Sequence, residues 1–134
     1  MHMMNDEIEH NYQFERLLTA VLDEPEKVPA IVSEDRSILE ERNCCDETAL
    51  HWLAIENQLE GIALLRGLGA KISPWAIAHA IEAGSLDAVA LMLELGGEPE
   101  LEVCKKYLEN RFWKLTKNQK RLVRSYFKQY GYEI

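Results

Sequence analysis

The feature that most constrains this fold is a residue pattern that returns after 27 positions. Residues 48–54 start a segment that continues through Leu64-Leu65 to Gly69-Ala70, and residues 75–97 follow a similar order that ends in Leu91-Met92-Leu93 and Gly96-Gly97. Matching positions carry similar residues: Leu50 and Ile77, Ala54 and Ile81, Leu59 and Leu86, Leu64 and Leu91, Gly69 and Gly96. Such a repeat predicts units that bury their apolar faces by stacking on one another.

Apolar residues recur at helical rather than alternating spacing along the chain, which predicts an all-α fold. A first amphipathic helix is expected over residues 8–22, followed by a short apolar segment at 28–32. Near the C-terminus, Thr116 and Gln119 have the spacing of a capping box, and Gly131 is placed to end that helix. Its apolar stripe is expected at Leu122, Val123, Tyr126, Phe127 and Tyr130.

Two motifs in the repeat resemble those of the ankyrin family, most clearly over residues 46–99. The sequence TALH at 48–51 is similar to the family's T-P-L-H turn into its inner helix, and LLRGLGA at 64–70 is similar to the end of its outer helix. The resemblance implies a short solenoid of three to four helix pairs. It divides the chain into a degenerate first repeat or cap (1–45), two repeats (46–73 and 74–100) and basic capping helices (101–134).

The chain departs from the family pattern in the length of its repeat, which is 27 rather than the usual 33 residues. The missing residues fall between Ser73 and Trp75, where the family has a β-hairpin finger, so we expect reduced or absent fingers. Ala78 stands where the first repeat has His51, so the turn hydrogen bond that the resemblance assigns to His51 is expected to be lost there. Small residues are expected where inner helices touch outer ones, at Ala54, Ala63 and Ala80.

The resemblance implies a protein-binding role through a concave groove on the inner helices. The residues expected on that groove are Trp52, Ile55, Glu56, His79, Glu82 and Ala83. A tryptophan beside an isoleucine and two carboxylates is typical of a binding hot spot for a basic partner. The competing interpretation is that Trp52 packs on the neighbouring helix. Trp75 and Trp113 are expected in the core or between repeats.

Charge is divided unevenly along the chain. Residues 1–100 hold 6 Lys and Arg against 20 Asp and Glu, whereas residues 101–134 hold 9 against 3. An acidic body repels the phosphate backbone of nucleic acids and favours a basic protein partner. Small acidic ankyrin-like proteins resemble bacterial immunity proteins, which gives a narrower hypothesis: neutralisation of a cognate basic toxin, with fast association steered by charge.

The basic C-terminal helix provides an alternative function, binding to nucleic acid. Lys117, Arg121, Arg124 and Lys128 recur at helical spacing and share one face. The simpler interpretation is a capping helix whose basic face is solvated.

We expect no catalysis, no cofactor and no metal. Cys44, Cys45 and His51 lack the spacing of a metal site, and Cys104 falls at the apolar spacing of a core residue. No phosphate-binding, nucleophile-elbow or metal-hydrolase motif is present in the sequence. The odd cysteine count, the polar start and the absence of a long apolar run predict a cytoplasmic protein that does not enter a membrane.

Overall fold

A computed structural model describes residues 2–110 and 115–134, with the backbone alone described for residues 2–11. The helices that open the chain are α1 (His2–Asp23), the 3₁₀ turn η1 (Pro25–Lys27), α2 (Val28–Glu34) and the 3₁₀ turn η2 (Arg36–Glu40). They are followed by α3 (Ala49–Ile55), α4 (Leu59–Gly67), α5 (Pro74–Ala83), α6 (Leu86–Glu94), α7 (Leu101–Glu109) and α8 (Lys117–Gln129). The described residues form no β-strand, so the all-α prediction is confirmed.

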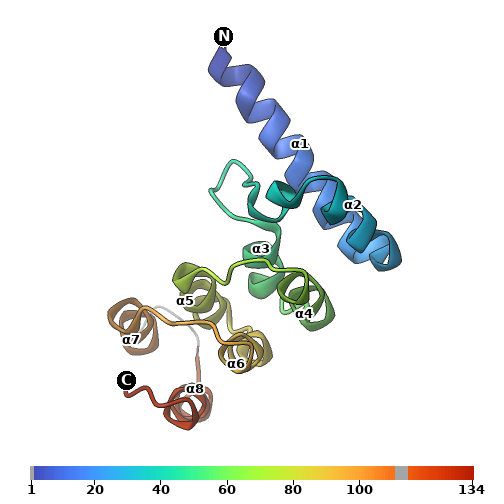
Figure 1. Ribbon diagram of the computed structural model, residues 1–134. Helices are drawn as coiled ribbons and strands as arrows, with labels where there is room; N and C mark the ends of the chain where they lie inside the picture. Colours follow the sequence, from blue (N-terminus) through green and yellow to red (C-terminus); the bar gives the residue numbers. More distant parts are fainter. Residues whose placement is uncertain (1, 111–114) are drawn as a thin grey trace.

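Successive helices alternate between two rows (Figure 1). One row holds α3, α5 and α7, and the other holds α4, α6 and α8, with α3 packed on α4 and α5 packed on α6. The first helix, α1, packs against α2 and α3 at one end of the stack. Each helix therefore buries its apolar face mainly against neighbours that are close in sequence.

The 27-residue period reappears in the turns between helices. Gly69 and Gly96 follow α4 and α6 with left-handed φ angles of 106° and 87°, a conformation that suits glycine. Each glycine amide donates to the carbonyl three residues earlier, at 3.0 and 3.1 Å. The turns after α3 and α5 match in the same way, with Asn57 and Gly84 in the left-handed region. The predicted glycine helix ends are confirmed.

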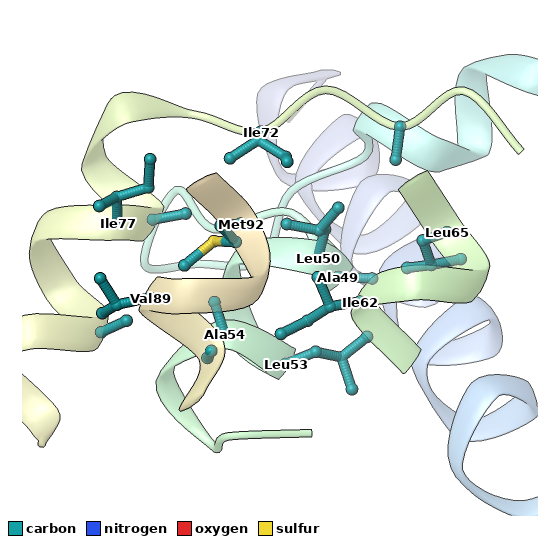
Figure 2. Close-up of a cluster of buried hydrophobic side chains, with 14 of the residues drawn as sticks. Ala49, Leu50, Leu53, Ala54, Ile62, Leu65, Ile72, Ile77, Val89 and Met92 are labelled. Atoms are coloured by element: carbon teal, nitrogen blue, oxygen red, sulfur yellow. The ribbon is translucent and has the colours of Figure 1, made fainter. Parts of the chain in front are cut away.

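The core lies between the two rows, where leucine, isoleucine and methionine side chains from four helices interlock (Figure 2). Its fully buried members include Leu50, Leu53, Ile62, Leu65, Ile77 and Met92. Ala54 and Ala80 are completely buried, as expected for small residues between rows. The same expectation is wrong for Ala63, which is exposed because it lies on the outer side of α4.

Two arginines donate hydrogen bonds to carbonyl groups just after outer-row helices, Arg36 from η2 to the end of α4 and Arg66 from α4 to the end of α6. The Arg66 guanidinium donates to the Ala70 carbonyl at 3.0 Å and reaches across to the Leu95 carbonyl at 3.2 Å. Arg36 donates to the Leu68 carbonyl, at the position 27 residues before Leu95. These donors satisfy carbonyl groups that the helix ends leave without intrahelical partners, and the positive charge suits the helix C-terminus.

The turns that lead into α3 and α5 are held by hydroxyl groups. The Thr48 hydroxyl accepts from the His51 amide at 3.3 Å, and the Ser73 hydroxyl accepts from the Trp75 amide at 3.2 Å. α5 starts directly after Ser73, and β-structure in the described residues is limited to one bridge between Arg42 and Thr48. The His51 side chain hydrogen-bonds to His79 on α5.

The predicted capping box at residues 116–119 is present and starts α8. Val123 and Phe127 are completely buried, and α8 packs against α6. The predicted apolar stripe is wrong at Leu122 and Tyr130, which are 42% and 39% exposed. Residues four apart share a helix face, so the buried face of α8 is narrower than the stripe of apolar letters in its sequence.

Candidate functional site: an aromatic surface on α5 and α7

The six residues expected on the groove lie on adjacent helices: Trp52, Ile55 and Glu56 at the end of α3, and His79, Glu82 and Ala83 on α5. Glu56 and Ala83 are exposed, and the other four are partly buried. Trp52 is partly buried and packs against the hydrophobic core. The exposed aromatic surface lies further along the stack.

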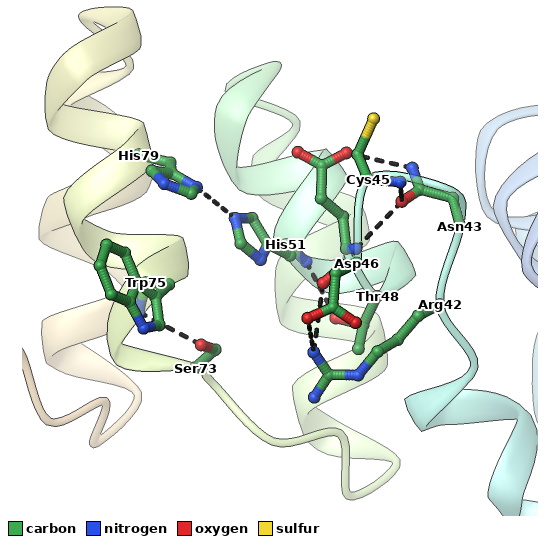
Figure 3. A network of polar contacts seen from close by, with 10 residues as sticks. Arg42, Asn43, Cys45, Asp46, Thr48, His51, Ser73, Trp75 and His79 are labelled. Atoms are coloured by element: carbon green, nitrogen blue, oxygen red, sulfur yellow. Dashed lines mark hydrogen bonds and ion pairs between the residues drawn. The ribbon is translucent and has the colours of Figure 1, made fainter.

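A hydrogen bond between two imidazole rings joins α3 to α5. The Nε2 atom of His51 lies 2.8 Å from the Nδ1 atom of His79 (Figure 3). His51 is almost completely buried, and that burial is the main reason why its pKa is lowered. The neighbouring His79 and Arg42 lower the pKa of His51 further, while Glu47 and Asp46 act in the opposite direction. The His51 ring therefore favours the neutral form, which can take part in this bond.

His79 is also the centre of a row of rings that crosses from α5 to α7. The ring centroid of Trp75 lies 5.6 Å from that of His79, and the Tyr107 ring lies 6.2 Å from His79 in an edge-on arrangement. Trp75, His79 and Glu82 recur at positions that share one face of α5. Burial raises the pKa of Tyr107, and a hydrogen bond from its hydroxyl to Glu82 raises it further.

A hollow of about 380 Å³ opens between α5 and α7 beside these rings. It is lined by Trp75, Val103, Lys106, Tyr107 and Asn110. Half of the Trp75 surface is exposed, although tryptophan is usually buried to a larger extent. The hollow thus combines rigid aromatic walls with polar groups at the rim, a composition typical of binding sites.

Trp75 was expected in the core or between repeats, and the first alternative is wrong because half of its surface is exposed. Its place on the hollow between α5 and α7 agrees with the second alternative. Trp75 occupies the first turn of α5, at the position that corresponds to the helix-capping Thr48 in the preceding repeat. In the sequence, the helical spacing of Trp75, His79 and Glu82 could have indicated that these residues share a surface. Tyr107 lies beyond the clear repeat, so its place on that surface could not be predicted in this way. Trp113 lies outside the described residues.

The basic face of α8 is exposed to solvent. Lys117, Arg121, Arg124 and Lys128 are all exposed, and Arg124 donates from Nε to the Ile134 carbonyl at 3.3 Å. These cations lie on the last helix of the outer row, whereas the aromatic hollow lies on the inner row. The two candidate sites therefore use different parts of the molecule.

The surroundings of the cysteines and of the other metal-ligating side chains bear on metal and thiol chemistry. No cluster of three or more His, Cys, Asp or Glu side chains suited to a metal ion occurs in residues 2–110 and 115–134 as far as these are described. Cys104 is completely buried, as predicted, and this burial raises its pKa to about 12. Cys44 and Cys45 are exposed.

A second hollow, of about 460 Å³, lies between α4 and α6 on the outer row. Its apolar lining is Leu59, Ala63, Ala90 and Leu91, and its acidic residues are Glu60, Asp87 and Glu94. Its lining contains no aromatic ring, so the hollow between α5 and α7 is the stronger candidate for binding.

Comparison with known proteins leaves the chain unassigned. No family model, curated protein or solved structure matches it. Among the described helices, none has the length and apolar character needed to span a membrane. Function is therefore inferred from the geometry of the residues themselves.

Proposed function

We propose that this chain is a non-catalytic protein-interaction module of the ankyrin type, which binds a basic protein partner through its inner row of helices. The observation that carries the proposal is the hollow between α5 and α7, which is lined by half-exposed Trp75 and by Tyr107, with the His79 ring next to that of Trp75. Rigid aromatic rings in a pocket are the groups that contribute most to protein interfaces.

The charges around the hollow define the expected partner. Glu82 shares the α5 face with Trp75, Glu56 is exposed at the end of α3, and residues 1–100 are strongly acidic. An arginine of the partner can stack on the Trp75 ring while these carboxylates complement its charge. Lys106 at the rim is exposed on a long flexible stem, so its ammonium group can turn towards solvent.

The ankyrin assignment and the narrower role are part of the same proposal. They are supported by the threonine-capped turn at Thr48, the left-handed glycines at Gly69 and Gly96, and the alternation of helices between two rows. Within this class, the acidic charge favours an immunity protein that neutralises a basic toxin, because opposite charges speed association. Capture that returns only chaperones and no stable basic partner would count against that role.

Affinity capture with matched variants tests the proposed surface. The wild-type chain is compared with Trp75→Ala and Glu82→Lys, and the captured partner is then purified for calorimetry. We expect each variant to weaken binding by at least about 2 kcal/mol, roughly a thirtyfold loss of affinity.

The controls place the same changes elsewhere on the molecule. Tyr12→Ala removes an exposed ring from α1, and Glu94→Lys reverses a charge on the outer row. Both controls should bind as the wild type does. The proposal fails if the controls weaken binding as much as Trp75→Ala and Glu82→Lys, or if all five proteins bind alike.

A second candidate function, nucleic-acid binding, rests on the four exposed cations of α8. Simultaneous alanine replacement at Lys117, Arg121 and Arg124 would then abolish RNA or DNA binding and remove its dependence on salt concentration. Nucleic acid in the captured material, without a protein partner, would favour this function over the first.

A further inference from the structure

Two cysteines stand side by side on the loop that precedes α3, outside the proposed interaction surface. Cys44 and Cys45 are both exposed, and their Sγ atoms lie 3.9 Å apart. The chain's third cysteine, Cys104, is completely buried in α7. The protein therefore presents one accessible pair of thiols and keeps its remaining thiol away from solvent.

The loop is held in a defined turn around Cys45 (Figure 3). The Asn43 side-chain oxygen accepts from the amides of both Cys45 and Glu47, at 3.0 Å in each case. Arg42 donates to the Asp46 carbonyl at 3.1 Å and forms an ion pair with its carboxylate. Because the turn is already ordered, a group that bonds to both thiols loses little additional conformational freedom.

Attack by the Cys45 sulfur alone is disfavoured. The pKa of Cys45 is raised, first by its hydrogen-bonding contact with the Cys44 side chain and then by the charges of Cys44 and Glu47. The thiolate is the nucleophilic form, so a reagent that attacks Cys45 alone finds less of it at neutral pH. Two exposed sulfurs only 3.9 Å apart are suited to an acceptor that forms bonds with both of them.

We propose that Cys44 and Cys45 form a two-thiol binding site for trivalent arsenicals, which are soft acceptors that bond to sulfur. With phenylarsine oxide, two As–S bonds replace the As=O bond, and both S–H protons leave with that oxygen as one water molecule. Arsenic remains trivalent and no sulfur is oxidised, so the reaction needs no oxidant. The described residues provide no cluster of three metal ligands, which favours such a two-bond acceptor over zinc with its four ligands.

Intact-mass spectrometry of the full chain, treated with one equivalent of phenylarsine oxide at pH 7, tests the site. We expect one adduct per chain in the wild type and in Cys104→Ala, since the buried thiol takes no part. Cys44→Ser and Cys45→Ser each leave one accessible thiol, and their apparent affinity should fall by about a hundredfold or more, because the second bond is no longer intramolecular.

Reversal of the adduct separates a two-thiol site from ordinary thiol labelling. Ethanedithiol should strip arsenic from the wild type, whereas 2-mercaptoethanol at the same thiol concentration should remove much less. Circular dichroism checks that both serine variants keep the wild-type helix content. The proposal is overturned if the wild type forms no adduct, if either serine variant binds as tightly as the wild type, or if binding requires Cys104.

Discussion

Two imidazole rings joined at 2.8 Å need one donor and one acceptor, so the bond between His51 and His79 depends on protonation. Burial lowers the pKa of His51, whereas in the unfolded chain this side chain titrates near 6.5. The unfolded state therefore binds more protons below that pH, and stability is lost as the pH falls towards the folded-state pKa of His51. We expect the free energy of unfolding, measured by urea titration, to be lower at pH 5.5 than at pH 7.5.

His51→Gln provides the matched comparison, because its amide keeps hydrogen-bonding groups but does not titrate. The difference in stability between the two pH values should be smaller in this variant than in the wild type. All carboxylates and the other histidines are common to both proteins, so the comparison isolates His51 and its partner. Equal pH dependence in the two proteins would contradict a lowered pKa for His51.

The sequence predicted single residues well where burial depends on helical spacing and less well at the edges of helices. Cys104 lies in the core because its spacing with its neighbours is that of a buried helix face. Trp52 and Trp75 carry the same side chain, yet only the ring of Trp75 is half exposed. That difference depends on how far each residue lies from the ends of its helix and on packing against α7, neither of which a one-dimensional pattern contains.

At the scale of helices and turns, Gly97 and Gly67 provide opposite tests of packing. A Cβ atom on Gly97 would lie 2.8 Å from both the Met92 carbonyl oxygen and the Ile72 side chain. Gly97→Ala should therefore destabilise the protein by about 1–3 kcal/mol. Gly67, the last residue of α4, has open space around that position, so Gly67→Ala should stabilise it by roughly 0.4–1 kcal/mol.

Urea denaturation at a fixed pH measures both effects through the transition midpoint. The two substitutions add the same methyl group, so each is the control for the other. A stabilising Gly97→Ala would show that the turn after α6 can open to admit the new atom, and a destabilising Gly67→Ala would contradict the free space at the end of α4.

The helices and their stops were predictable because their signals are local. Apolar spacing, the capping box at 116–119 and the left-handed glycines act within a few residues of where they occur. The contact from Arg66 to the Leu95 carbonyl spans 29 residues, and the one from Arg36 to Leu68 spans 32. Such contacts exist only after the helices have stacked, so no local pattern of residues predicts them.

At the scale of the whole molecule, packing in two rows makes the free energy of unfolding nearly a sum of contributions from single helices and from the interfaces between neighbours. The described helices contact mainly those next to them in the stack, so the stabilities of the two ends are coupled through the central helices α3 to α6. In such an arrangement each unit adds its own stability and that of its interfaces. A cavity at one end should therefore loosen that end more than the other.

Phe127→Ala tests this coupling at the C-terminal end, where the ring is completely buried in α8. The lost burial and the remaining cavity should cost about 3–5 kcal/mol locally. Native-state hydrogen exchange should then show the largest loss of protection in α8, a smaller loss in α6 and the smallest in α1. Leu17→Ala, at an equally buried position in α1, should give the reverse gradient. Uniform loss of protection along the chain in both variants would instead mean that the stack unfolds as one cooperative unit. Its two ends would then be coupled more strongly than contacts between neighbouring helices can explain.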